Sequence, residues 1–140
     1  MMRFMNKVVV FFFLTVISTN TIYGQTTLEN DSSVFAQIAV ENESYNFGEL
    51  IQGDKGAHIF KFRNTGNAPL ILNNVLSTCG CTAPEWSKEP IPADSTGIIK
   101  VVFDSTAKIG RQNKVITIRS NSKNGDYRLR ISAMVLPPEK

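Results

Sequence analysis

Two cysteines, Cys79 and Cys81, stand one glycine apart and are the only cysteines in this chain of 140 residues. Two residues of extended strand would place their Cα atoms about 6.5–7 Å apart, whereas a disulfide usually joins Cα atoms about 5.5–6 Å apart. A bend at Gly80 would shorten this distance, because glycine lacks Cβ and bends more freely than other residues. The spacing therefore permits a local Cys79–Cys81 disulfide that is strained and more easily reduced than most.

Three kinds of chemistry fit this cysteine pair. The first is a structural disulfide, or two small buried thiols, that fixes a turn. The second is a redox-active dithiol, although the usual C-x-x-C spacing at the start of a helix is absent. The third is a soft-metal site for copper or zinc, in which two thiolates fill half of a tetrahedral shell and the single histidine, His58, adds a third ligand. The sequence leaves these alternatives open.

Trp86 follows the cysteines by five residues, in a stretch rich in proline. Its large side chain can pack as a lid on the core, or it can form a contact face beside the cysteines. We therefore take Cys79 and Cys81 as the candidate disulfide or redox pair, with Gly80 and Trp86 as supporting residues. No catalytic residue, cofactor-binding residue or bound cofactor is expected.

The N-terminus has the pattern of a secretory signal. Arg3 and Lys7 precede an apolar run of about ten residues, 8–17, which is too short for a helix to cross a bilayer core of ~30 Å. The pattern predicts a cleavable signal helix over residues 1–24, and an uncleaved membrane anchor is the alternative. Export to the periplasm or the extracellular medium would place the cysteines in an oxidising compartment, which favours a disulfide. No later run predicts a membrane span.

The charge balance gives no indication of nucleic-acid binding. The net charge of the whole chain is +3, and loss of Arg3 and Lys7 would leave 13 basic against 12 acidic residues. A domain that binds nucleic acid usually has a clear basic excess. Some basic residues gather near the C-terminus, as a solvated strand face or, alternatively, as a contact for an anionic partner. They are Arg119, Lys123, Arg128 and Arg130.

Alternating apolar and polar residues predict short strands along most of the mature chain. Residues 25–36 are polar and predict a flexible leader. Strands are expected near 38–40, 44–47, 57–64, 70–76, 96–103, 114–120 and 127–135. Both faces of 96–103 are apolar, which predicts a central position. The proline-rich stretch from Ala83 to Ser95 is expected to be a loop or an edge crossing, and Asn124-Gly125 predicts a hairpin turn.

These elements together predict an all-β fold. No segment of the mature chain has a helical period, and turn residues recur every 8–12 residues, as in β-sandwiches. We expect an immunoglobulin-like β-sandwich of about seven strands over residues 37–136, with a tail over 137–140. Its length fits one domain.

Several short motifs within residues 44–135 carry a resemblance to a known family. The most specific is Cys79-Gly80-Cys81-Thr82, which follows an Asn64-Thr65-Gly66 turn. The others are Phe47-Gly48-Glu49-Leu50, Gly53, Phe60-Lys61-Phe62-Arg63, Asn67-Ala68-Pro69-Leu70, Pro92, residues 99–104 and Ser120-Asn121. Together they resemble the exported bacterial domain-of-unknown-function family 1573. The resemblance implies an immunoglobulin-like sandwich, similar to PapD-like and cilia-associated β-domains, and it implies no established activity.

The residue types give little support for catalysis. The chain has one histidine, no Ser-His-Asp order, no phosphate-binding glycine loop and no paired carboxylates on one face, so we predict that it is not an enzyme. The leading hypothesis is an exported module that binds an envelope or extracellular protein, or another component of the cell envelope, and its sheet edges suit the addition of a strand. The alternative is thiol–disulfide or soft-metal chemistry at the cysteine pair. Two triplets, Asp94-Ser95-Thr96 and Asp104-Ser105-Thr106, fit either turn caps or O-glycan acceptors.

Overall fold

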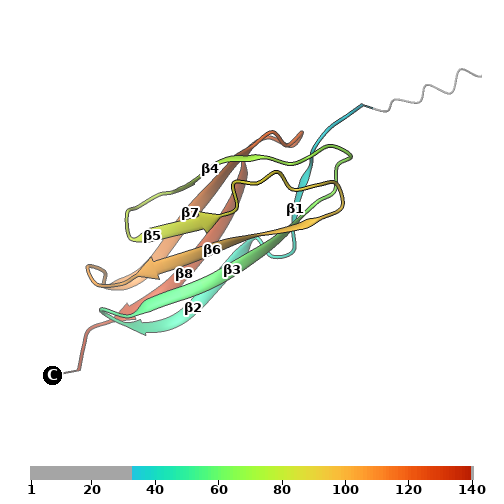
Figure 1. The fold of residues 1–140 in the computed structure, drawn as a ribbon. Helices are drawn as coiled ribbons and strands as arrows, with labels where there is room; N and C mark the ends of the chain where they lie inside the picture. Colours follow the sequence, from blue (N-terminus) through green and yellow to red (C-terminus); the bar gives the residue numbers. More distant parts are fainter. Residues whose placement is uncertain (1–32, 140) are drawn as a thin grey trace, which may run out of the picture. The chain divides into compact units, whose positions relative to one another are not determined.

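The structure, a computed structural model, describes residues 33–139, and the predicted signal peptide and most of the predicted leader lie outside them. Over these residues the chain forms eight β-strands in two four-stranded sheets (Figure 1). The strands are β1 (Ile38–Val40), β2 (Ser44–Ile51), β3 (Lys55–Asn64), β4 (Leu72–Ser77), β5 (Thr82–Trp86), β6 (Thr96–Asp104), β7 (Gly110–Ser120) and β8 (Tyr127–Leu136). No helix within 33–139 is long and apolar enough to cross a membrane.

The strand order is β1-β3-β6-β5 in one sheet and β2-β8-β7-β4 in the other. We call them the β6 sheet and the β8 sheet. Every pairing is antiparallel except that of β2 with β8, which is parallel. The chain changes sheets between β1 and β2. As a result β1 pairs with β3 in one sheet, and β2 pairs with β8, the last strand, in the other. The all-β sandwich predicted from the sequence is therefore confirmed.

The core lies between the two sheets and is built from the inward side chains of alternating strands. β3 contributes Phe60 and Phe62, as the alternation predicts, and both are at most 2% exposed. The other large apolar side chains of the core are Ile38, Leu70, Leu72, Val75, Ile91, Ile99, Val101, Phe103, Ile116, Ile118, Leu129, Ile131 and Val135. Burial of these apolar surfaces supplies the main driving force for folding.

One strand confirms the sequence expectation and another departs from it. β6 lies between β3 and β5, so the predicted central position of 96–103 is confirmed. The stretch expected to be a loop or edge crossing begins with β5, which raises the number of strands to eight. Pro84 is tolerated there because β5 is an edge strand and pairs on one side only. The predicted hairpin turn between β7 and β8 is present, and Gly125 has a φ of +73°.

The last residues of the predicted leader are part of the domain. The Phe35 N–H donates to Asn67 Oδ1 (2.8 Å), the Phe35 carbonyl accepts from the Asn67 N–H (2.9 Å), and Ala36 is 2% exposed. Gly66 permits this approach, because a Cβ there would lie 2.3 Å from the Phe35 carbonyl oxygen. The folded part therefore begins at or before Phe35 rather than at residue 37.

Asn64 is a buried polar residue at this end of the sandwich, with 0% of its surface exposed. Its Nδ2 donates to the carbonyls of Ala68 (2.7 Å) and Ile91 (3.0 Å). Its Oδ1 accepts from the N–H groups of Gly66 (3.1 Å) and Gln37 (3.3 Å). One side chain thus joins the N-terminal segment, the turn after β3 and the loop before β6, with every polar atom satisfied.

Candidate functional site

Cys79 and Cys81 form a disulfide in the turn that joins β4 to β5, where the chain crosses between sheets (Figure 1). Their Cα atoms are 5.3 Å apart, within the range that a disulfide spans without backbone movement. Both residues are half-buried, and Cys81 packs against the hydrophobic core. This bridge agrees with a structural disulfide and equally with the oxidised form of a redox-active dithiol.

The bend between the cysteines comes from the turn rather than from an unusual glycine conformation. The Thr82 N–H donates to the Cys79 carbonyl (3.3 Å), which closes the turn. Gly80 is exposed and is not among the glycines with a positive φ. A Cβ built on Gly80 would have no neighbouring atom within 4 Å. An alanine would fit there, so the special freedom that the sequence interpretation gave to Gly80 is not used.

Thr82 completes this site, although the sequence analysis did not select it. It is 4% exposed, and its Oγ1 lies 3.7 Å from Cys79 Sγ and 4.0 Å from Cys81 Sγ. A disulfide sulfur has no proton to donate, so the threonine hydroxyl is the donor in either contact. The alternation of side chains along β5 predicts that Thr82 points inward, because Thr82, Pro84 and Trp86 all face the core.

The disulfide turn is also attached to neighbouring strands by backbone hydrogen bonds. The Asp104 N–H at the end of β6 donates to the Cys81 carbonyl (2.8 Å). The Thr78 N–H donates to the Val115 carbonyl on β7 (3.1 Å), and the Val115 N–H donates to Thr78 Oγ1 (3.3 Å). These bonds do not involve sulfur, so they hold the turn whether or not the disulfide is intact.

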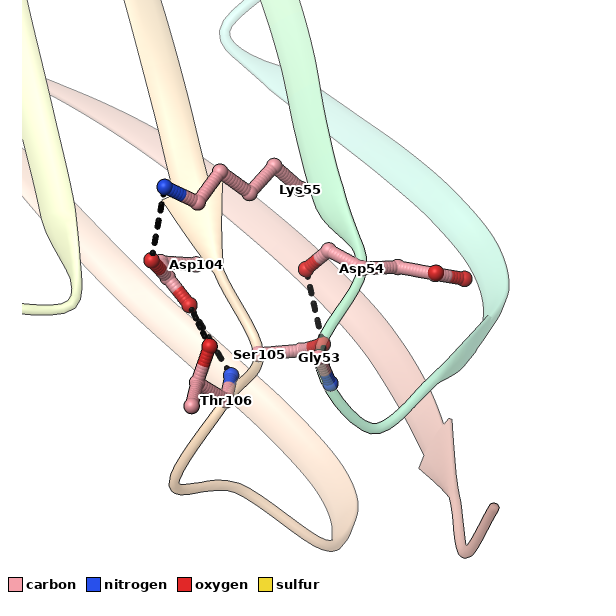
Figure 2. A network of polar contacts seen from close by, with 6 residues as sticks. All are labelled: Gly53, Asp54, Lys55, Asp104, Ser105 and Thr106. Atoms are coloured by element: carbon pink, nitrogen blue, oxygen red, sulfur yellow. Dashed lines mark hydrogen bonds and ion pairs between the residues drawn. The ribbon is translucent and has the colours of Figure 1, made fainter.

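A polar network continues from Asp104 to the turn between β2 and β3 (Figure 2). The Asp104 carboxylate accepts from the Thr106 N–H (2.9 Å) and hydroxyl (2.5 Å), and pairs with Lys55 (3.3 Å). These hydrogen bonds from Thr106, with a smaller contribution from Lys55, lower the pKa of Asp104 to about 2. Asp104 thereby caps its own turn, as one of the two interpretations of the Asp-Ser-Thr triplet predicts.

Ser105, the middle residue of that triplet, is fully buried. Its Oγ accepts from the Gly53 N–H (3.1 Å) and lies 3.0 Å from the Ile51 carbonyl and 2.8 Å from the Asp54 carbonyl. Figure 2 shows it pointing into the turn before β3. In the folded domain this hydroxyl is engaged in holding two loops together and is closed to a glycan transferase.

Trp86 lies at the far end of β5, four residues from Thr82, which corresponds to about 13 Å of strand. Its Nε1 donates to the Leu72 carbonyl on β4 (3.4 Å), and its ring packs against the core. The Lys88 Nζ lies 3.2 Å from the ring centroid. This arrangement agrees with a lid on the core rather than with a contact face beside the cysteines.

His58 has a different neighbourhood from the cysteines. It lies on β3, two strands from β5, which is about 10 Å across the sheet. Its ring stacks on Tyr45 with 3.6 Å between centroids, and burial lowers its pKa. Within residues 33–139, no three His, Cys, Asp or Glu side chains are grouped so as to hold a metal ion.

The basic residues near the C-terminus do not form one site. Arg119 pairs with Asp126 (3.7 Å), and the Lys123 Nζ lies 4.6 Å from the centroid of the Phe35 ring. Arg128 and Arg130 point outward from β8 and are exposed. The arrangement agrees with a solvated strand face.

The outer face of the β6 sheet carries an apolar patch, which we call the β6 patch. It consists of Ala57 and Ile59 on β3, Ile98 and Val102 on β6, and Ala83 on β5. Ala57, Val102 and Ala83 form a row across three strands, and Ile59 and Ile98 extend it diagonally with 47% and 49% of their surfaces exposed. Outward positions of a sandwich are usually polar, so these five apolar residues depart from the rule, although charged residues such as Lys61 and Lys100 share the face.

The edges of both sheets carry features that oppose strand addition. β1 has three residues, β2 has a register shift next to Gly48, and β5 contains Pro84. β4 has a register shift after Leu72, whose carbonyl already accepts from Trp86. Short edges, bulges and prolines are the usual devices by which sheets avoid pairing with another chain.

Solved structures with a similar fold share little sequence with this chain. A protein of unknown function from Porphyromonas gingivalis has a TM-score of 0.63 at 16% identity, over 71% of this chain and 46% of that one. PapD-like domain 7 of human CEP192 has a TM-score of 0.63 at 10% identity, over 75% of this chain and 89% of that one. The VesB protease of Vibrio cholerae has a TM-score of 0.57 at 14% identity, over 70% and 32% of the chains.

These similarities and the strand order define a PapD-like, immunoglobulin-like β-sandwich. This chain spans less than half of the Porphyromonas gingivalis protein, and at this level of identity the likeness concerns the fold alone. A comparison with curated proteins finds no match. Residues 38–135 match the family described as "Protein of unknown function (DUF1573)", so the chain belongs to this family and the resemblance noted from its motifs is confirmed.

Proposed function

We propose that this protein is an exported, non-enzymatic β-sandwich that binds another protein, and that the β6 patch is the contact surface. Export is supported by the basic and apolar pattern of residues 1–24. The single observation that carries the binding role is the exposure of Ile59 and Ile98 at the centre of one sheet face. Contiguous exposed apolar surface is a mark of protein–protein contact sites.

The protected edges favour this face over strand addition. A partner strand would have to pair with β1, β2, β4 or β5, each of which is short, shifted or interrupted by proline. The outer face of β3 and β6 has no such obstacle, because these are the two longest and most regular strands of their sheet. Binding would therefore use side chains rather than backbone hydrogen bonds.

The charges around the β6 patch indicate the kind of partner that would fit. Lys100 lies within the patch, opposite Ile59 and between Ile98 and Val102, and its charge is neutralised by Glu85 (3.3 Å). At the rim, Lys55 pairs with Asp104 and Arg63 pairs with Asp94 (3.2 Å). Lys61 stands opposite Ile98 and has no ion pair among the described residues. A partner with an apolar surface and one carboxylate near Lys61 would be complementary.

The test compares crosslinked pull-downs from an envelope extract with the mature protein as bait. Ile59→Glu and Ile98→Glu should each lower recovery of the partner by about tenfold or more, because a charge would be buried in an apolar contact. Ile109→Glu is the matched control, since Ile109 is 54% exposed in the loop after β6 and outside the patch. All three variants should melt like the unsubstituted protein, because the side chains point outward.

Failure to recover a reproducible partner would count against the binding role. Equal recovery with all three variants would refute the assignment to the β6 patch, even if a partner is found.

A further inference from the structure

We propose that the Cys79–Cys81 disulfide is a thiol–disulfide exchange site that oxidises external thiols, and that the Thr82 hydroxyl stabilises the departing thiolate. This activity is separate from the proposed binding function and depends on a different part of the domain. Four observations support it: access to the sulfurs, the size of the loop, the position of Thr82 and the attachment of the turn.

Access is unequal for the two sulfurs. Both cysteines are half-buried, but Cys81 packs against the core whereas Cys79 does not. Gly80 between them is exposed, and nothing lies within 4 Å of its Cβ position, so no side chain covers the turn there. An attacking thiolate must approach along the S–S axis from the solvent side. Cys79 Sγ is therefore the sulfur attacked, and Cys81 Sγ is the leaving group.

The bridge is expendable for the fold, which leaves it free to react. The bridge joins residues two positions apart, so the loop that it closes in the unfolded chain is very short. A disulfide stabilises mainly by restricting the unfolded chain, and this effect is smallest for short loops. Bridges that contribute little stability and remain accessible are typical of the labile disulfides.

Thr82 is placed to assist either sulfur when the bond breaks. Its hydroxyl lies 3.7 Å from Cys79 Sγ and 4.0 Å from Cys81 Sγ, and the residue is 4% exposed. A buried hydroxyl donor beside a developing thiolate stabilises the charged sulfur. A better stabilised thiolate leaves faster in exchange.

The turn should keep its shape after reduction. The hydrogen bonds from Asp104 to the Cys81 carbonyl and between Thr78 and Val115 do not involve sulfur. They hold both ends of the turn on β6 and β7, so the two thiols stay near each other and can be oxidised again.

The reaction balances with two equivalents of an external thiol, either small or on a protein. The first thiolate attacks Cys79 Sγ, a mixed disulfide forms, and the Cys79–Cys81 bond breaks with its electron pair passing to Cys81 Sγ. A second thiolate then attacks the external sulfur of the mixed disulfide and releases Cys79 as a thiolate. Two external thiols are oxidised to one disulfide, and both cysteines take up the released protons.

The experiment equilibrates the oxidised protein with a series of reduced and oxidised glutathione, traps thiols by alkylation and measures them by mass spectrometry. The bridge should be half reduced in buffers that leave the long-loop disulfides of a reference secreted protein intact. In a time course at one glutathione ratio, sampled before equilibrium by the same alkylation, the rate of reduction should fall about tenfold in Thr82→Val, the loss expected for one hydrogen bond to a charged group. Thr82→Ser, which restores the hydroxyl, should recover the rate.

Circular dichroism of the reduced protein, and of the Cys79→Ser/Cys81→Ser double variant, separates exchange from unfolding. Both should keep the spectrum of the oxidised domain. The proposal would be overturned if the bridge stayed oxidised in every buffer that leaves the reference disulfides intact. An unchanged rate in Thr82→Val, or loss of the native spectrum on reduction, would also overturn it.

Discussion

Replacing Asn64 by alanine should be among the most damaging changes of a polar residue in this domain. Asn64 is fully buried and makes four side-chain hydrogen bonds, to Ala68, Ile91, Gly66 and Gln37. The Ile91 carbonyl keeps a second bond from the Leu70 N–H (2.8 Å). The other three backbone groups would lose the partner that Asn64 provides.

The magnitude follows from these three groups. Leaving a buried donor or acceptor without its partner costs about 1–3 kcal/mol, and entering water would recover part of this. We expect Asn64→Ala to lower the free energy of unfolding by about 3–5 kcal/mol, a large share of the 5–15 kcal/mol typical of a domain. For about 100 residues this corresponds to a fall in melting temperature of roughly 15–30 °C.

Urea and thermal unfolding can be followed by the fluorescence of Trp86, the single tryptophan of the chain. The matched control is Asn67→Ala, in the same turn. Asn67 is exposed, and within residues 33–139 its side chain bonds to the Phe35 N–H (2.8 Å) and the Ser33 carbonyl (3.2 Å), so its loss should cost at most about 1 kcal/mol. If the two variants unfold within about 1 kcal/mol of each other, the assignment of Asn64 as the buried junction of three segments is wrong.

Three further predictions concern pH, the disulfide and one glycine. The pKa of Asp104 is lowered to about 2 from 3.8, so its contribution to stability is present above pH 4 and is lost as the pH falls toward 2. In thermal melts between pH 4 and 2, Asp104→Asn should therefore lose less stability than the unsubstituted protein, and an equal loss in both would contradict this prediction. The Cys79→Ser/Cys81→Ser double variant should lose only about 1.6 kcal/mol in the chain-entropy estimate for a three-residue loop, and collapse of the domain in calorimetry would exclude this estimate. Gly66→Ala should cost about 1–3 kcal/mol because its Cβ would meet backbone at 2.3 Å, whereas Gly80→Ala has open space and should be neutral; similar urea midpoints for both would refute the packing argument.

The sequence by itself determined the local features of this protein. A period of two along β3, β7 and β8 identified strands and the side of each that becomes buried, because strand side chains alternate between faces. Asn124-Gly125 identified the turn between β7 and β8, in which Gly125 has a φ of +73°, a value that glycine adopts without strain. The spacing of Cys79 and Cys81 permitted a bridge because the two residues are neighbours along the chain whatever the rest of it does.

Only the tertiary structure decided which segments meet. The burial of Asn64 and the approach of Phe35 to Gly66 depend on segments that are distant in sequence. The β6 patch likewise exists because the register of β3 against β6 brings Ile59 and Ile98 to one face. A local pattern fixes which side of a strand is apolar. What that side contacts is fixed by the pairing between strands, and this pairing results from the packing of the whole core.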